Sequence, residues 1–282
     1  RRGLLLAFFI CPFLISTLNA QSNTKYGDID PEQFKITRYK VDTTAAAVYL
    51  FDEGSCYYEG NHAYDLTLVY TRHARIHLIN RNSFDLATVE IPLYQDGTYR
   101  EEIENLKATT YNFQNGKIEA TDIDKNTIFK DNNGNITIRK FTFPAIKEGS
   151  IIEFSYKITT PSFQSIRPWL FQSTYPKLRC EYNVSIPDFY DFAILKQGYH
   201  PFILDTVKTS FDNYIFDSNN SLQTTTAHYT WAVKDIPALK EEAFTTTLAN
   251  HISRIEFQLS ALKFPNASVK MVLQDWYKVG EE

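Results

Sequence analysis

The chain is poor in cysteine, methionine and glycine. Of its 282 residues, 3 are Cys, 1 is Met and 10 are Gly. Only Cys56 and Cys180 follow the first twenty residues, and neither begins a predicted helix or stands in a nucleophile-like context. A cysteine enzyme built on either thiol is therefore not expected. In an oxidising compartment the two could form a disulfide, but we prefer two buried, unpaired thiols, because the sequence does not set their separation.

Other signatures of catalysis are also missing. The sequence has no glycine loop that could cradle a phosphate and no carboxylate pair that stands out from ordinary surface acids. We therefore expect no catalytic residue and no cofactor. The formal charge is −4, or −6 once Arg1 and Arg2 leave with the predicted leader, and the lysines are scattered. Without a basic stripe, nucleic acid is not an expected partner.

Two short patterns resemble metal sites and are interpreted otherwise. His73 and His77 are four residues apart in a segment with strand periodicity. On a strand they would lie about 13 Å apart, so they could not share an ion and are expected to be exposed. The stretch "DIDKN" at 122–126 begins like a calcium loop, but Thr127 and Asn133 stand where that loop needs Gly and Glu. A solvated turn is the better interpretation, and no metal is expected.

Only one long apolar run is present. Residues 1–20, "RRGLLLAFFICPFLISTLNA", combine two arginines, an apolar segment and a terminal Ala20, which predicts a secretory signal peptide. The run is too short for a good membrane anchor, and no second one follows. We therefore expect an exported chain with no membrane span after signal cleavage.

What the sequence does contain favours strands. It has 18 Tyr, 21 Phe and many Thr, and apolar residues recur at every second position in many segments. The longest such segment is "AYDLTLVYTRHARIHLIN" at 63–80, whose apolar face is broken only by Arg72. Asn115-Gly116 and Asn133-Gly134 predict hairpins, and "AVYLFDEGSCYY" predicts two short strands around Asp52-Glu53-Gly54. The fold class that we expect is all-β, an antiparallel sandwich over 41–262, with a junction between two sheets or subdomains near 160–170 at Pro161 and Pro168.

The stretch "FTFPAIKEGSIIEFSYKI" at 141–158 is interpreted as a hairpin of the scaffold. Gly149 suits its turn, and Ile152, Phe154, Tyr156 and Ile158 form an apolar face. The intervening Glu153, Ser155 and Lys157 are expected to face water.

Helices are expected only at the two ends. Residues 21–40 form a predicted helical lead-in in which Asp30 caps, Pro31 suits the first turn and Gln33 completes a capping box. Residues 263–282 form a second one, because Val269, Val272, Leu273 and Trp276 have helical spacing.

Trp169 and Trp231 have two interpretations. With neighbouring aromatics they could form a surface on which sugars stack, or they could be core residues of a sandwich. Core is favoured because large aromatic side chains bury much area.

Five segments, in order, carry a family resemblance. They are "DTTAAAVYLFDEG", "RHARIHLIN", the stretch at 141–158, "WLFQSTYPKLRCEYNVSIP" and "IPALKEEAFTTTLANHISRIEFQLS". Together they resemble domain of unknown function 3857, a module of exported proteins of Bacteroidetes, over roughly residues 40–262.

The resemblance implies a β-sandwich accessory module that precedes a transglutaminase-like domain with a Cys, His, Asp triad. It carries no known catalytic residue onto this chain. It implies the periplasm or cell surface of a Gram-negative bacterium and, as partner, such a domain in the same or a neighbouring polypeptide. A stand-alone module that binds an envelope protein, peptide or glycan is the alternative. The chain ends at Glu282 without a capping signal, which predicts that it stops short of the catalytic domain.

Overall fold

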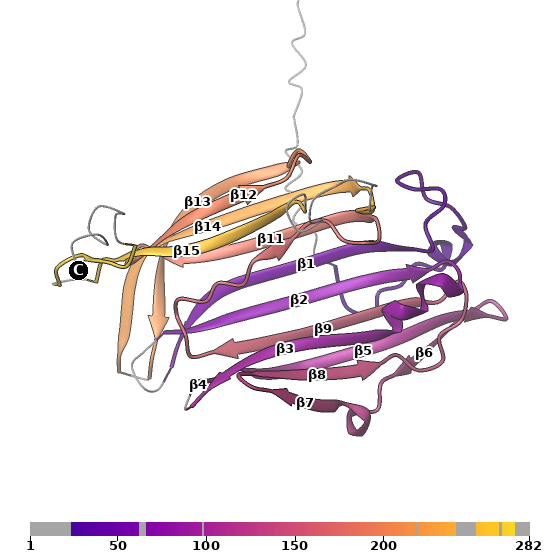
Figure 1. The fold of residues 1–282 in the computed structure, drawn as a ribbon, viewed down its shortest axis with the longest axis horizontal. Helices are drawn as coiled ribbons and strands as arrows, with labels where there is room; N and C mark the ends of the chain where they lie inside the picture. Colours follow the sequence, from indigo (N-terminus) through magenta and orange to yellow (C-terminus); the bar gives the residue numbers. More distant parts are fainter. Residues whose placement is uncertain are drawn as a thin grey trace, which may run out of the picture.

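The computed structural model describes residues 24–61, 66–97, 99–217, 219–240, 252–264 and 267–273. One large sheet forms its first layer (Figure 1). Its eight strands follow the order β13 (Leu204–Ile215), β14 (Ser221–Ile236), β11 (Lys177–Pro187), β1 (Ala47–Gly60), β2 (Leu66–Leu78), β9 (Ile151–Thr160), β5 (Glu102–Gln114) and β6 (Lys117–Asp122).

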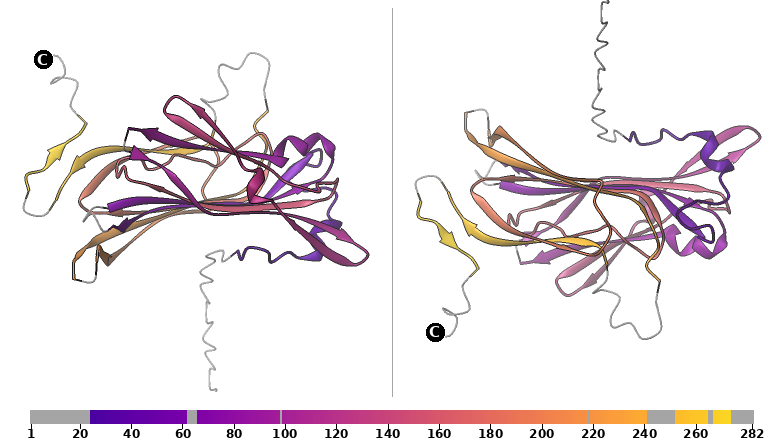
Figure 2. Two further views of the ribbon diagram at one scale, coloured as in Figure 1. Left: turned by 90° about the horizontal axis from the view of Figure 1, so that it is seen from below. Right: turned by 90° about the horizontal axis from the view of Figure 1, so that it is seen from above.

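Two smaller sheets form the second layer. One has the order β10 (Trp169–Leu170), β15 (Arg254–Leu262) and β12 (Tyr190–Gln197), with β16 (Lys270–Met271) beside β15. The other has the order β4 (Tyr99–Arg100), β3 (Thr88–Asp96), β8 (Ile136–Thr142) and β7 (Phe129–Asn133). Both lie on the same face of the large sheet, and the N-terminal segment runs along the other face (Figure 2). The predicted all-β, sandwich-like class is confirmed.

The core lies between the layers, as the strand periodicity requires. The apolar face of β2 that the sequence predicts is buried, from Leu66 at one end to Leu78 at the other. Directly paired β9 contributes Ile152, Phe154 and Ile158 to the same face. Alternate apolar residues on paired strands therefore build a continuous interior.

Strand β1 corrects two expectations. It is one strand of 14 residues rather than two short ones, and it pairs with β11 in parallel, so the sheet is not purely antiparallel. The Asp-Glu-Gly sequence that looked like a turn continues the strand, because Asp52 pairs with Arg72 and with the buried Lys177, and Gly54 lies against the Trp169 ring. A Cβ at Gly54 would lie 2.4 Å from a ring carbon of Trp169, so this position has no room for a side chain.

Both predicted hairpins are confirmed. Asn115 and Gly116 have φ values of 50° and 76° and join β5 directly to β6. The second hairpin joins β7 to β8 through Gly134 and Asn135, with Asn133 opposite Ile136 and Gly134 at a φ of 58°. These positive φ values match the turns that two-residue hairpin loops require.

The stretch at 141–158 is not a hairpin. Its first strand, β8, pairs with β3 and β7 in a small sheet, whereas β9 pairs with β2 and β5 in the large sheet. Gly149 does adopt a positive φ of 81°, but the turn carries the chain from one layer to the other. Residues 161–168 make the return crossing between β9 and β10.

The ends differ from the predicted helices. The N-terminal one is a 3-10 helix, η1 (Pro31–Lys35), in which the Asp30 carboxylate accepts from the Glu32 N–H at 2.9 Å. At the C-terminus, the described part of 263–282 contains strand β16 where helix was predicted. Trp276 and the predicted signal peptide lie outside the described residues.

Two further helical segments among the described residues, η2 (Arg81–Ala87) and η3 (Lys125–Thr127), are also 3-10 helices. None of the helical segments in the described part of the chain could span a bilayer.

Candidate functional site

A charged cluster is buried between the layers around Asp52. Its carboxylate accepts two hydrogen bonds from Arg72, at 2.9 and 3.0 Å, and one from the Lys177 ammonium at 2.7 Å. The side chains of Asp52 and Lys177 are only 1% and 3% exposed. Burial alone would raise the pKa of Asp52, but the two cations outweigh it and lower the pKa to about 2.

This cluster explains the charge that interrupts the apolar face of β2. Arg72 lies 5.4 Å from the ring centre of Phe154 and 5.7 Å from that of Trp169, so aromatic faces flank its guanidinium. Because every charge is matched by an opposite charge or an aromatic face, the cluster ties β1, β2 and β11 together. Its ion pairs and ring contacts give it a structural role.

Both thiols lie in the same interior. The Trp169 indole N–H donates to Cys180 Sγ at 3.2 Å, and Cys56 is four residues along β1 from the strand position that faces Cys180. Both are free and buried, so the structure does not contain the disulfide considered from the sequence. Burial raises the pKa of each thiol to about 12, which leaves no thiolate at neutral pH to act as a nucleophile.

Trp169 and Trp231 are core residues in the structure. They are 3% and 1% exposed. Trp169 stacks on Tyr182 with ring centres 4.9 Å apart, and Trp231 stacks on Tyr229 at 5.3 Å. Neither indole lies on a surface that a glycan could reach.

The outer face of the large sheet is more buried than its polar sequence predicts. Glu153 was expected to face water, yet its side chain is 0% exposed. It accepts from Arg75 and contacts His73, each at 2.8 Å, and the N–H of Gly27 donates to it at 3.0 Å. The N-terminal segment lies over this face, and Tyr26 hydrogen-bonds Thr109 at 2.8 Å.

His77 is likewise buried rather than exposed. Its Nδ1 hydrogen-bonds the Tyr39 hydroxyl at 2.8 Å, and the residue is 1% exposed. Burial lowers the pKa of His77 to about 4 despite an opposing backbone hydrogen bond, so the imidazole is neutral at physiological pH. His73 and His77 serve two separate contacts, and no group of metal-ligating side chains gathers within the described ranges.

Asp124 in the calcium-like stretch caps η3 by accepting from the Asn126 N–H at 2.9 Å. Asp122 instead accepts from the Thr109 hydroxyl on β5 at 2.6 Å. The two carboxylates thus serve different contacts, in keeping with a turn.

A serine, histidine and aspartate meet on the outer face without forming a catalytic triad. Ser185 contacts His228 Nδ1 at 2.9 Å, while Ser210 and Asp212 both contact Nε2, at 2.7 and 3.2 Å. A triad needs its serine and carboxylate on opposite ring nitrogens and an oxyanion hole beside the serine. Ser185 and Asp212 do contact opposite ring nitrogens, but Ser185 lies within strand β11, directly opposite His228 of β14, where main-chain donors serve the sheet ladder.

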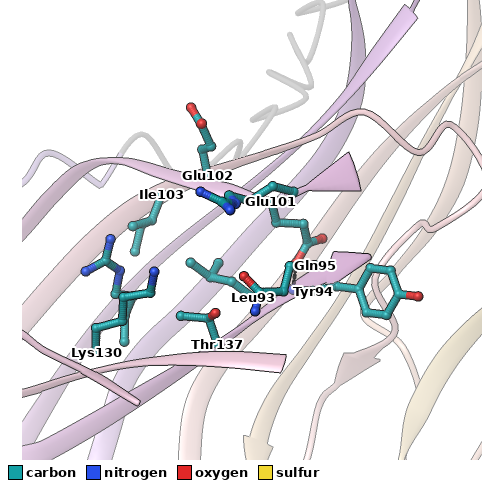
Figure 3. Close-up of a pocket in the computed structure, with 10 residues that line it drawn as sticks. Leu93, Tyr94, Gln95, Glu101, Glu102, Ile103, Lys130 and Thr137 are labelled. Atoms are coloured by element: carbon teal, nitrogen blue, oxygen red, sulfur yellow. Dashed lines mark hydrogen bonds between the residues drawn. The ribbon is translucent and has the colours of Figure 1, made fainter. Parts of the chain in front are cut away.

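A cleft of about 280 Å³ opens between β3, β8 and β7 of the small sheet and the start of β5 (Figure 3). Leu93 and Ile103 supply its apolar lining, and its cations are Arg100, Lys130 and Arg139. No site residue was predicted here. The Asn133-Gly134 hairpin could have revealed part of the site, since its register places Lys130 opposite Arg139.

Apolar side chains are exposed at the end of the sandwich where β15 leads into β16 (Figure 1). Phe264, Val269, Met271 and Val272 are 39%, 57%, 61% and 40% exposed, and we call these four the C-terminal apolar surface. A cavity of about 370 Å³ adjoins it, lined by Leu66, Tyr190, Phe216, Asn220, Ser221, Leu222 and Phe264. Exposed apolar side chains beside an apolar cavity are typical of a surface that another body covers.

Comparison with known proteins agrees with this fold. The DUF3857 family model, described as a "Domain of Unknown Function with solved-structure structure", matches residues 65–240. A crystal structure from Parabacteroides distasonis, of a protein described as a candidate protease, has a TM-score of 0.54 and 16% identity. The match covers 78% of this chain but only 41% of that protein, so this chain spans less than half of its length.

A zinc metallopeptidase of the M1 class from Deinococcus radiodurans has a TM-score of 0.27 and 9% identity, over 71% of this chain and 45% of the other. That likeness is too slight to support an argument. No curated protein matches the sequence.

Proposed function

Because the chain belongs to the DUF3857 family, we propose that it is a non-catalytic, exported module that supports or positions a transglutaminase-like catalytic domain. The observation that carries the proposal is the C-terminal apolar surface, which lies at residues 264–272, after strand β15. A following domain that packs there would cover Val269 and Met271 and fill the adjoining cavity. The match to less than half of the Parabacteroides protein is what a module within a longer polypeptide would give.

The buried thiols support the non-catalytic part of the proposal. A nucleophilic cysteine needs access and a lowered pKa, and Cys56 and Cys180 have neither. The catalytic chemistry would belong to the covering domain, and this module would hold that domain in place.

The first experiment reads the natural polypeptide past Glu282 and assays the isolated chain. We expect a downstream domain with a Cys, His and Asp triad. We also expect no protease or protein cross-linking activity from the isolated chain. Turnover by this chain alone, or the lack of any such domain in the same or a neighbouring polypeptide, would contradict the proposal.

The second experiment tests the surface in the longer polypeptide. Met271→Ser and Val269→Ser should weaken the contact, speed hydrogen exchange across 259–273 and lower the activity of the attached domain. Phe129→Ser is the matched control, because Phe129 is 70% exposed but lies on β7. Equal effects of the control and the surface variants would show that this surface is not the interface.

Peptide binding along a sheet edge is the second candidate. Strand β13 ends the large sheet, and its Val207, Phe211 and Ile215 are 56%, 70% and 63% exposed. Such an edge can accept an extended peptide as an added strand. Proline substitution at Phe211 should abolish capture of extended peptides by the isolated chain, and unchanged capture would exclude this mode.

A further inference from the structure

The cleft in Figure 3 shares no lining residue with the cavity that adjoins the C-terminal apolar surface. Leu93 and Thr137 face each other across β3 and β8, as do Ile91 and Arg139, and the buried Leu93 and Ile91 mark the inner side of this sheet. Arg139 therefore points toward the space between the layers rather than toward bulk water.

The charges of this cleft do not balance locally. Arg100, Lys130 and Arg139 line it, and within the described part of the chain none of the three lies within 4.0 Å of a carboxylate. Of the two acids in the lining, Glu101 is bound to Arg167 and also accepts from the Tyr94 N–H at 2.8 Å. Figure 3 shows the Glu102 side chain directed away from the other lining residues.

The cations of this cleft are poorly compensated by the protein itself. Lys130 and Arg139 stand directly opposite each other on β7 and β8, and like charges at such a pair repel. The Nε atom of Arg139 is buried and has no hydrogen-bond partner among the described residues. A bound anion would relieve the repulsion and accept from the guanidinium, which is suited to paired hydrogen bonds with an oxyanion.

We propose that this cleft binds a small organic anion, with its oxyanion group held by Arg139, Lys130 and Arg100 and its apolar part on Leu93 and Ile103. The volume of about 280 Å³ suits a ligand of roughly monosaccharide or dipeptide size. A peptide carboxylate and a sugar acid share this chemistry. The inference is independent of the proposed positioning role.

Calorimetric titration of the isolated chain tests the site with N-acetyl-leucine, glucuronate and inorganic phosphate. N-acetyl-leucinamide and glucose are the neutral counterparts of the two organic anions. We expect saturable binding of at least one organic anion, no binding of its neutral counterpart, and weaker binding as salt rises. The preferred anion distinguishes a peptide end from a sugar acid.

Arg139→Met should weaken this binding about tenfold or more, the effect of losing one charge-assisted contact. Lys140→Met is the matched control, because Lys140 is the next residue on β8 but pairs with Glu90 at 2.7 Å. Lys130→Met gives an independent test if Arg139→Met does not fold.

Three results would overturn the proposal. One is the absence of saturable binding to either organic anion. Another is an equal loss of affinity in Arg139→Met and Lys140→Met, which would indicate non-specific attraction. The third is tighter binding of phosphate than of both organic anions, which would exclude a role for Leu93 and Ile103.

Discussion

Replacing Asp52 with asparagine tests whether the buried charges hold the two layers together. The substitution keeps the shape of the side chain but removes the carboxylate that Arg72 and Lys177 share. Lys177, 3% exposed, would keep its hydrogen bond to the Leu170 carbonyl at 3.0 Å but would lose its counter-ion. A buried cation without a counter-ion is strongly unfavourable, because water no longer solvates it.

The magnitude follows from two arguments. Removing one partner of a buried ion pair costs about 3–5 kcal/mol. Separately, the pKa of Asp52 falls from 3.8 to about 2 in the folded protein. Each pKa unit corresponds to about 1.4 kcal/mol, so roughly 2 kcal/mol of the stability at neutral pH depends on ionisation of this carboxyl. We expect Asp52→Asn to lower the free energy of unfolding by about 3–5 kcal/mol at pH 7.

The pH dependence gives an independent check. Because the folded pKa lies below the unfolded one, the stabilisation is present above about pH 4 and is lost as the pH falls toward 2. Across this pH range, the free energy of unfolding of the wild-type chain should fall by roughly 2 kcal/mol more than that of Asp52→Asn. Urea unfolding monitored by tryptophan fluorescence measures both the stability at pH 7 and its change with pH, since Trp169 lies against Arg72.

Glu32→Gln is the control, because the Glu32–Lys35 pair is exposed and such pairs contribute about 0–1 kcal/mol. A loss below about 1 kcal/mol for Asp52→Asn would refute the reasoning, since it would place the variant within the range of an exposed pair.

Three further predictions concern the interior. Burial lowers the pKa of His77 to about 4, so its neutral form contributes fully to the free energy of unfolding above pH 6.5, and that contribution falls as the pH drops toward 4. Between pH 7 and 5, His77→Gln should therefore lose roughly 2 kcal/mol less stability than the wild-type chain, as measured by urea unfolding. Burial raises the pKa of Cys56 and Cys180 to about 12, so a thiol reagent at pH 8 should label them only after unfolding. Gly54→Ala should destabilise the chain by about 1–3 kcal/mol and shift the fluorescence of Trp169, because its Cβ would overlap the indole.

Each of these has an outcome that contradicts it. An unchanged pH profile in His77→Gln would mean that the histidine is not held neutral by the fold. Rapid labelling of either thiol in the native chain would reopen the cysteine-enzyme hypothesis. For Gly54→Ala, wild-type stability would show that the Trp169 ring can move aside. Gly116→Ala is the comparison, because no atom lies within 4 Å of its added Cβ and only the turn conformation is strained.

Features that depend on neighbouring residues could be predicted before the fold was known. The buried face of β2 follows from its period of two, and the β5–β6 hairpin follows from Asn115 and Gly116, which accept positive φ values. The capping role of Asp30 is equally local, since its carboxylate binds an N–H two residues away. In each case the relevant interaction lies within a few residues along the chain.

Features that depend on residues far apart in the sequence could be seen only in the packed fold. The alternation of residues along β9 places Glu153 on the polar face of that strand. Glu153 is nevertheless buried, because the N-terminal segment crosses that face. The partners of Arg72 could not be read from the sequence, because Lys177 reaches Asp52 from 125 residues away. Alternation shows which side of a strand is polar, whereas the element that covers that side is set by how the layers pack.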